Sequence, residues 1–151
     1  MKNWFNPADA DALTARLQRL TPDLRPRWGK MSPNDVLPHL ADPFRTALGD
    51  KPVKLLGGPL NMPGISQLVL WVLPWPKGAP TAREYLPGTG MTNATDFEAD
   101  RQTLLGLLRR FTDFPATANF AANPVFGPLS RRAWGRQAWR HLDHHLRQFG
   151  E

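Results

Sequence analysis

Proline constrains this chain more than any other residue, because it has no backbone N–H and interrupts both helices and sheets. The sequence contains 16 prolines in 151 residues, about twice the usual share of roughly 5%. They lie mostly outside the stretches that have helical periodicity. We therefore expect helices joined by long, stiff and irregular connections.

Four segments have the apolar spacing of amphipathic helices. They cover residues 7–20, 32–48, 95–111 and 131–149. Asn6, Ser32 and Ser130 are candidate caps for three of them, and Thr95 opens the remaining one. No alternating strand pattern of useful length and no internal repeat is found. The predicted fold class is all-α, a helical bundle.

Residues 50–93 connect the second and third predicted helices and are rich in proline and glycine. Residues 65–75 are the most apolar segment, which is far shorter than the roughly 20 residues needed to span a bilayer. We expect a buried helix or a short hydrophobic turn there. The first residues lack the apolar core of a signal peptide, so we expect a cytoplasmic protein with no membrane partner.

Length and composition narrow the possible functions. A chain of 151 residues and 17.0 kDa fits one domain, residues 1–151. The absence of cysteine excludes a disulfide framework, a thiolate metal site and a cysteine nucleophile. The formal net charge of +6 permits contact with anions without specifying one. No Ser/His/Asp arrangement, paired-carboxylate signature or glycine-rich phosphate loop is recognised.

Three of the four histidines lie close together in the last predicted helix: His141, His144 and His145. At about 100° per residue, His141 and His145 fall about 40° apart on one edge of the apolar face. Histidines four residues apart project from adjacent turns and can bind one Zn, Ni or Fe ion. The pair therefore predicts two ligands of a metal site, whereas Asp143 points away from it.

A third ligand for such a site must come from another helix, and His39 is the remaining histidine. It lies beside the apolar stripe of its own helix, which favours a place at the side or mouth of a pocket. His39, His141 and His145 are thus the candidate metal ligands. The alternative is that they are ordinary half-buried or solvated histidines. His144 falls on the polar side with Gln137, so we expect it to face solvent or to support a ligand.

Two other functions fit parts of the same sequence. Arg136, Arg140 and Arg147 form a basic strip on the last helix, which is compatible with nucleic-acid binding, but no recognition motif accompanies it. The other alternative is a non-catalytic bundle that dimerises through exposed Trp and Leu side chains of residues 65–75. The expected partner is a small-molecule substrate, with a homodimer as a further possibility and nucleic acid disfavoured.

One combination in the last helix is specific: His141, His144 and His145, followed by Gln148. Together with residues 123–130, 31–40 and 77–81, this helix resembles the DinB-like (damage-inducible protein B-like) superfamily. The resemblance is to an uncharacterised-domain branch of these metal-binding four-helix bundles. It extends over residues 30–150 and is strongest at the C-terminal end.

This resemblance implies an up-down four-helix bundle of DinB-like type, with a long Pro/Gly-rich connection between the second and third helices. It implies that a divalent metal, Zn or Ni, is held by His39, His141 and His145. It also implies a metal-dependent transferase or hydrolase acting on a small molecule such as a thiol. Asn123 departs from the pattern, because members of this branch often have a histidine there. Bundles of this kind also persist without their metal, which leaves a metal-free site as the alternative.

Overall fold

The computed structural model describes residues 1–62, 64–77 and 83–151, with the side chain of Glu84 left aside. Residues 78–81, which belong to a segment quoted above, lie outside this description. The elements are α1 (Pro7–Arg19), α2 (Pro33–Ala47), η1 (Pro59–Asn61), α3 (Ile65–Trp71), η2 (Arg83–Tyr85), α4 (Phe97–Asp113) and α5 (Arg131–Gln148). The described residues thus form five α-helices and no strand, only an isolated bridge between Asn123 and Gly127. The predicted all-α class is confirmed.

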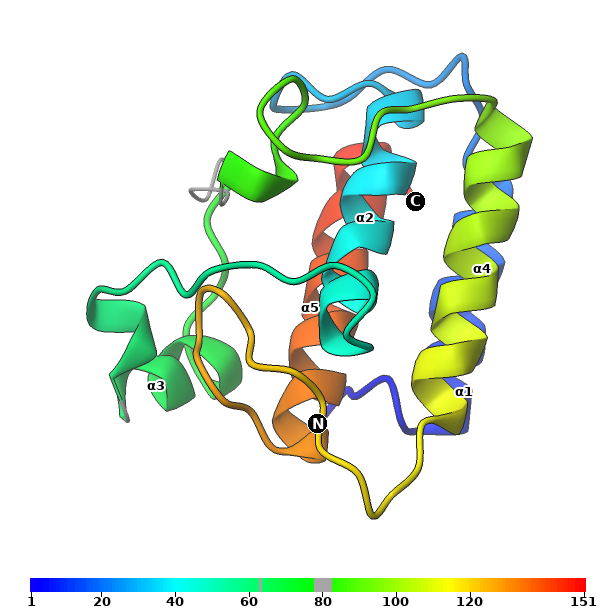
Figure 1. The fold of residues 1–151 in the computed structure, drawn as a ribbon. Coiled ribbons are helices and arrows are strands. Elements are labelled where there is room, and N and C mark those ends of the chain that lie inside the picture. Colours follow the sequence, from blue (N-terminus) through cyan, green and yellow to red (C-terminus); the bar gives the residue numbers. More distant parts are fainter. Residues whose placement is uncertain (63, 78–82) are drawn as a thin grey trace.

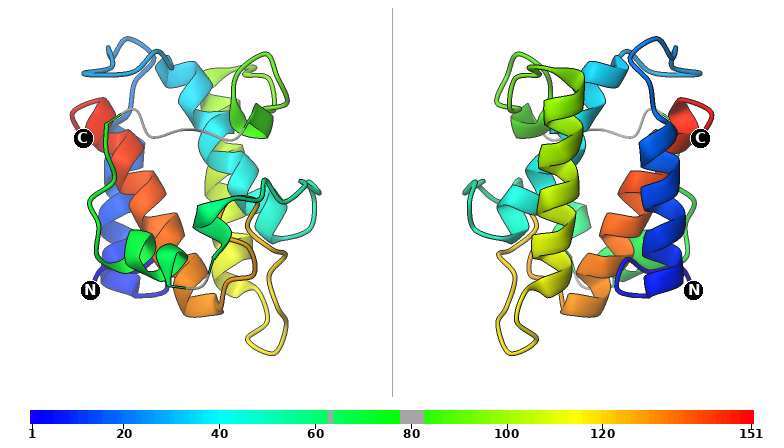
Figure 2. Two further views of the ribbon diagram at one scale, coloured as in Figure 1. Left: turned by 90° about the vertical axis from the view of Figure 1, so that its left-hand side faces the viewer. Right: turned by 90° about the vertical axis from the view of Figure 1, so that its right-hand side faces the viewer.

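The four longer helices are arranged as two pairs, as Figure 1 and Figure 2 show: α2 packs against α4, and α1 packs against α5. α2 also contacts α5. Buried apolar side chains of all four helices form one core, which includes Leu13, Leu17, Leu37, Leu40, Leu104, Phe111, Trp134 and Leu142. The apolar stripes that predicted these helices therefore face a common interior.

Three helices start at the predicted caps. The side chains of Asn6, Ser32 and Ser130 each accept a hydrogen bond from the backbone N–H three residues later. α4 begins two residues later than predicted, at Phe97, because Asp96 takes the cap position in place of Thr95. The short polar side chain that caps each helix thus decides where it starts.

α3 corrects the prediction for residues 65–75. A helix forms, but only Ser66 and Leu70 of its residues are buried. The carbonyl oxygens of Val69 and Leu70 in its last turn, and that of Leu73 just beyond it, accept hydrogen bonds at 2.5–3.1 Å. The donors are the guanidinium groups of Arg136 and Arg140. Cationic donors stabilise the unpaired carbonyls at a helix C-terminus. Two arginines of α5 therefore hold this short helix in place from one side.

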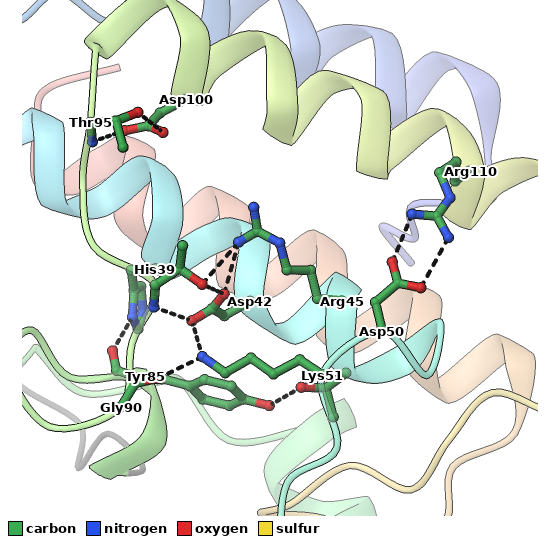
Figure 3. Close-up of polar contacts among 12 residues, drawn as sticks. His39, Asp42, Arg45, Asp50, Lys51, Tyr85, Gly90, Thr95, Asp100 and Arg110 are labelled. Carbon is green, nitrogen blue, oxygen red and sulfur yellow. Dashed lines mark hydrogen bonds and ion pairs between the residues drawn. The ribbon is translucent and has the colours of Figure 1, made fainter.

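Asp42 ties the long connection between α2 and α4 to α2 itself (Figure 3). Its buried carboxylate accepts hydrogen bonds from Arg45 at 2.9 Å and Lys51 at 2.5 Å, and from the backbone N–H and hydroxyl of Thr92 at 2.9 and 2.7 Å. Burial on its own raises the pKa of Asp42, but these hydrogen bonds outweigh it and hold the pKa below its ordinary value. Both ends of the connection are therefore fixed to one carboxylate.

We expect Asp42→Ala to lower the free energy of unfolding by about 3 kcal/mol, because it leaves two partly buried cations without their partner. Urea unfolding measures the change. Asp50→Ala is the matched control, since Asp50 pairs with Arg110 at the surface (Figure 3) and exposed pairs contribute little. Equal losses in the two variants would contradict a structural role for the buried carboxylate.

Candidate metal centre

His39, His141 and His145 converge between α2 and α5. His39 comes from α2 and is only 1% exposed, whereas His141 and His145 lie one turn apart on α5. The Nε2 atom of His39 lies 3.0 Å from Nε2 of His141 and 3.0 Å from Nε2 of His145. Each ring offers one nitrogen atom, and the three nitrogens lie within 4.8 Å of one another, so they could hold a metal ion. The structure brings together all three residues that the sequence predicted as ligands.

The orientation of His39 is fixed by the hydrogen bond on its other ring nitrogen (Figure 3). Nδ1 lies 2.8 Å from the backbone carbonyl oxygen of Tyr85. A carbonyl oxygen only accepts, so Nδ1 carries the proton and Nε2 of the neutral ring has a free lone pair. Tyr85 is fixed in turn, because its hydroxyl donates to Thr46 Oγ1 at 2.9 Å. The lone pair of His39 therefore points toward the other two histidines.

His145 is oriented in the same way by Gln148. The amide nitrogen of Gln148 donates to the Trp28 carbonyl oxygen at 2.6 Å, so its amide oxygen accepts from His145 Nδ1 at 2.9 Å. Nδ1 of His145 therefore carries the proton, and Nε2 does not. Gly29 permits this close approach: its φ is +76°, and a Cβ there would lie 2.7 Å from Gln148 Nε2.

Nε2 of His39 and Nε2 of His145 thus face each other at 3.0 Å with no proton between them. Two lone pairs at this distance repel unless a proton or a cation lies between them. Nitrogens bound at about 2.0–2.1 Å to a tetrahedral Zn ion are roughly 3.3 Å apart, close to this separation. A ligating histidine usually donates its other ring N–H to a carbonyl or carboxylate. A divalent metal therefore fits this donor set.

Burial keeps the three rings neutral. It is the largest cause that lowers the pKa of His39 and His141 below 6.5 and that lowers the pKa of His145 to about 3. Repulsion among the rings adds to the effect on His141 and His145. At neutral pH all three rings are therefore neutral imidazoles, the form that binds metals.

The three histidines line a cavity of about 710 Å³. Its apolar walls include Trp28, Pro43, Leu73, Trp75 and Phe126. Catalytic zinc sites have three protein ligands and keep a further position for water or substrate, whereas structural sites are closed by four. Three histidines at the wall of a cavity correspond to the catalytic arrangement.

Of the two expectations for His144, facing solvent or supporting a ligand, the first is wrong, and the polar-side assignment of Gln137 is wrong as well. His144 is 9% exposed and Gln137 is 7% exposed, and both line the cavity. Segments outside the helices cover this side of α5, with the rings of Trp28 and Trp75 centred 5.8 and 6.4 Å from that of His144. A helical wheel takes no account of such segments, so it assigned these residues to the polar face.

Asn123 and Asp143 stay outside the histidine cluster. Asn123 is buried and lines the cavity, and its side-chain oxygen accepts the backbone N–H groups of Val125 and Phe126 at 2.9 and 3.0 Å. Its carbonyl oxygen is therefore used to shape its own turn. Asp143 points away from the pair, as predicted, and forms an ion pair with Arg16 at 2.7 Å.

The orienting roles of Tyr85 and Gln148 were not predicted from the sequence. Tyr85 acts through its backbone carbonyl at the end of η2, and no side-chain motif reports such a contact. Gln148 gives a usable signal: it follows His145 by three residues, a spacing that puts two side chains on one face of a helix. That spacing could have identified Gln148 as the partner of His145.

The fold and the site define an all-helical protein with three converging histidines at the wall of an apolar cavity. The chain belongs to the DUF1569 family, described as a protein of unknown function, whose family model matches residues 60–151. The match includes His141 and His145 of α5 and does not extend to His39 of α2. No curated protein and no solved structure matches the chain.

We expect the metal-free protein to lose stability as the pH falls from about 7 to about 5. In the unfolded chain the histidines take up protons near pH 6.5, whereas in the folded state burial lowers their pKa, to about 3 for His145. The unfolded state therefore binds more protons in this window, and the free energy of unfolding decreases. Urea unfolding with a chelator present, repeated at successive pH values, measures the slope.

His145→Asn is the test variant, because the Asn amide can still donate to Gln148 but does not titrate. It should flatten the pH dependence of the unfolding free energy. Wild type and variant with equally steep profiles would show that the buried rings do not titrate as described.

Proposed function

We propose that this protein is a metal-dependent enzyme, a transferase or hydrolase acting on a small molecule, with Zn or Ni bound by His39, His141 and His145. The observation that carries the proposal is the pair of unprotonated Nε2 atoms, on His39 and His145, at a separation of 3.0 Å. Hydrogen bonds from Nδ1 to Tyr85 and Gln148 fix both rings in this form. A cation bound between these two nitrogens removes the repulsion of their lone pairs.

A bound metal would lower the pKa of a coordinated thiol or water and so supply a nucleophile at neutral pH. The side chains that line the cavity would bind and orient the substrate. Aromatic and proline side chains of the cavity wall would exclude bulk water and hold an apolar part of the substrate. Gln137, Asn123 and His144 add polar groups to the same wall.

We also propose that the chain is a four-helix bundle of the DinB-like superfamily. The two helix pairs support this assignment, as do one candidate ligand from α2 and two from α5. The connection between α2 and α4, residues 48–96, has the expected position and length. α3 is then an additional helix within this connection. A thiol substrate is inferred from the resemblance, so it is tested separately below.

The basic strip of α5 gives less support to nucleic-acid binding. Arg136 and Arg140 donate to carbonyl oxygens of residues 69–73 and are occupied in holding α3. Burial, followed by repulsion from Arg136, lowers the pKa of Arg140 to about 10, so it stays protonated at neutral pH. Arg147 forms an ion pair with Asp143. Phosphate binding would have to compete with these contacts.

The first test is a titration of metal-free, untagged protein with Zn²⁺ and Ni²⁺. We expect one ion per chain and a higher melting temperature, because a ligand that binds only the folded state stabilises it. Isothermal calorimetry and thermal unfolding measure the two effects. His141→Ala should abolish both.

His144→Asn is the matched control: it removes a neighbouring histidine outside the cluster and should keep one bound ion. Gln148→Ala should bind the ion about 10–100-fold more weakly, since it removes the acceptor that orients His145. Wild-type protein that binds no ion, or His144→Asn and His141→Ala that lose binding equally, would refute the three-histidine site.

The second test separates a thiol substrate from other small molecules. We expect a small thiol added to Co²⁺-loaded protein to produce a thiolate-to-cobalt charge-transfer absorption at neutral pH, because the metal lowers the thiol pKa. The corresponding alcohol is the control and should produce none. A cobalt spectrum unchanged by any thiol would exclude this substrate class while leaving metal binding in place.

A further inference from the structure

Exposed apolar side chains are concentrated in one segment. Among the described residues, eight of the nine large apolar side chains that are exposed lie between residues 55 and 73. We call these eight the apolar patch: Leu55, Leu56, Leu60, Met62, Ile65, Leu68, Val72 and Leu73. Scattered surface hydrophobic residues need no explanation, but a cluster of them marks an interaction surface.

The apolar patch belongs to one projecting part of the structure. η1 packs against α3, and the backbone N–H of Leu56 donates to the Pro124 carbonyl at 2.9 Å, which anchors the start of the segment. η1 and α3 stand out on one side of the four longer helices (Figure 1). The patch is therefore a feature of one side of the molecule, away from α4.

The segment that carries the patch has charges of a single sign. Residues 51–83 contain four Lys and Arg residues and no Asp or Glu, although the whole chain has 13 acidic residues. Lys51 binds the buried carboxylate of Asp42. Lys54 and Lys77 are exposed, and Nζ of Lys77 lies 5.0 Å from the centre of the Trp28 ring at the cavity wall. An apolar surface flanked by cations alone complements a surface that is apolar inside and anionic at its boundary.

We propose that the apolar patch docks this protein on an anionic lipid surface. Leu and Val side chains that enter the boundary of the acyl chains, with lysines among the headgroups, give the combination that binds anionic bilayers. In the part of the chain that the structure describes, no helix has the length and apolar character to cross a membrane, and surface binding requires none. The proposal departs from the sequence-based expectation of no membrane partner, which was argued from the lack of a spanning segment and of a signal peptide.

A second copy of the chain fits this surface less well. In a two-fold symmetric dimer the same patch lies on both sides of the interface. Lys54 and Lys77 of one copy would then find no acidic partner in the same segment of the other, because residues 51–83 contain no Asp or Glu. Anionic headgroups can pair with these cations, whereas an identical patch cannot.

The apolar patch continues into the cavity of the histidine cluster. Leu60 and Leu73 belong to both, and Trp75 follows them in the cavity wall. Docking would place this wall beside the bilayer, where a substrate with an apolar part is concentrated. The docking itself requires no metal, so it stands or falls independently of the proposed enzymatic function.

Sedimentation with lipid vesicles, using metal-free protein, tests the proposal. We expect the protein to sediment with vesicles of phosphatidylcholine and phosphatidylglycerol at low salt, and to bind pure phosphatidylcholine much more weakly. The variants Lys54→Gln and Lys77→Gln each remove one positive charge. Each should weaken binding to anionic vesicles about fivefold, because one Lys near such a surface contributes about 1 kcal/mol. The double variant Leu68→Ser and Val72→Ser should weaken it at least about tenfold.

Arg109→Gln is the matched control, since Arg109 is exposed on α4, away from the patch, and should bind like wild type. Circular dichroism confirms that each variant is folded. Failure of wild-type protein to bind anionic vesicles would overturn the proposal, as would an equal loss in Arg109→Gln and the lysine variants. Light scattering that shows a dimer, lost in the double Ser variant without any vesicle binding, would assign the patch to self-association instead.

Discussion

Two hydrogen bonds to carbonyl oxygens decide the chemistry of the histidine cluster. The Tyr85 backbone and the Gln148 side chain each accept a hydrogen bond from a histidine Nδ1–H, which leaves Nε2 of His39 and Nε2 of His145 unprotonated and 3.0 Å apart. Protonation would relieve their repulsion, but burial opposes a charge there and lowers both pKa values. The metal-free arrangement is therefore unfavourable by itself, and the surrounding structure must maintain it.

The irregular, proline-rich segments do much of this work. α2 and α5 carry the three histidines, but the Trp28 carbonyl precedes α2 and Tyr85 lies within the connection from α2 to α4. Asp42 fixes both ends of that connection, and Arg140 fixes α3 on α5. The same segments form the cavity wall and carry the apolar patch. The helices thus position the ligands, and the connections supply their partners and the entrance.

Sequence patterns predicted the parts of this structure that depend on periodicity. The four longer helices, their Asn and Ser caps and the pairing of His141 with His145 follow from apolar stripes and four-residue spacing. His39 was named as the third ligand because it is the remaining histidine and because the DinB-like resemblance implies it. The burial of His144 could not be predicted in this way, because the residue is covered by Trp28 and by a segment without periodicity. The orienting carbonyl of Tyr85 could not be read either, since every residue has one and only the tertiary fold selects which carbonyl meets His39.

In the proposed site, three imidazoles of this chain bind one ion through their Nε2 atoms. X-ray absorption spectroscopy of the zinc-loaded protein measures this most directly, because scattering through imidazole rings reports how many histidines bind and at what distance. We expect three imidazole nitrogens at about 2.0–2.1 Å and at least one oxygen ligand from solvent. A shell with fewer than three imidazoles, or one made only of oxygen, would contradict the claim.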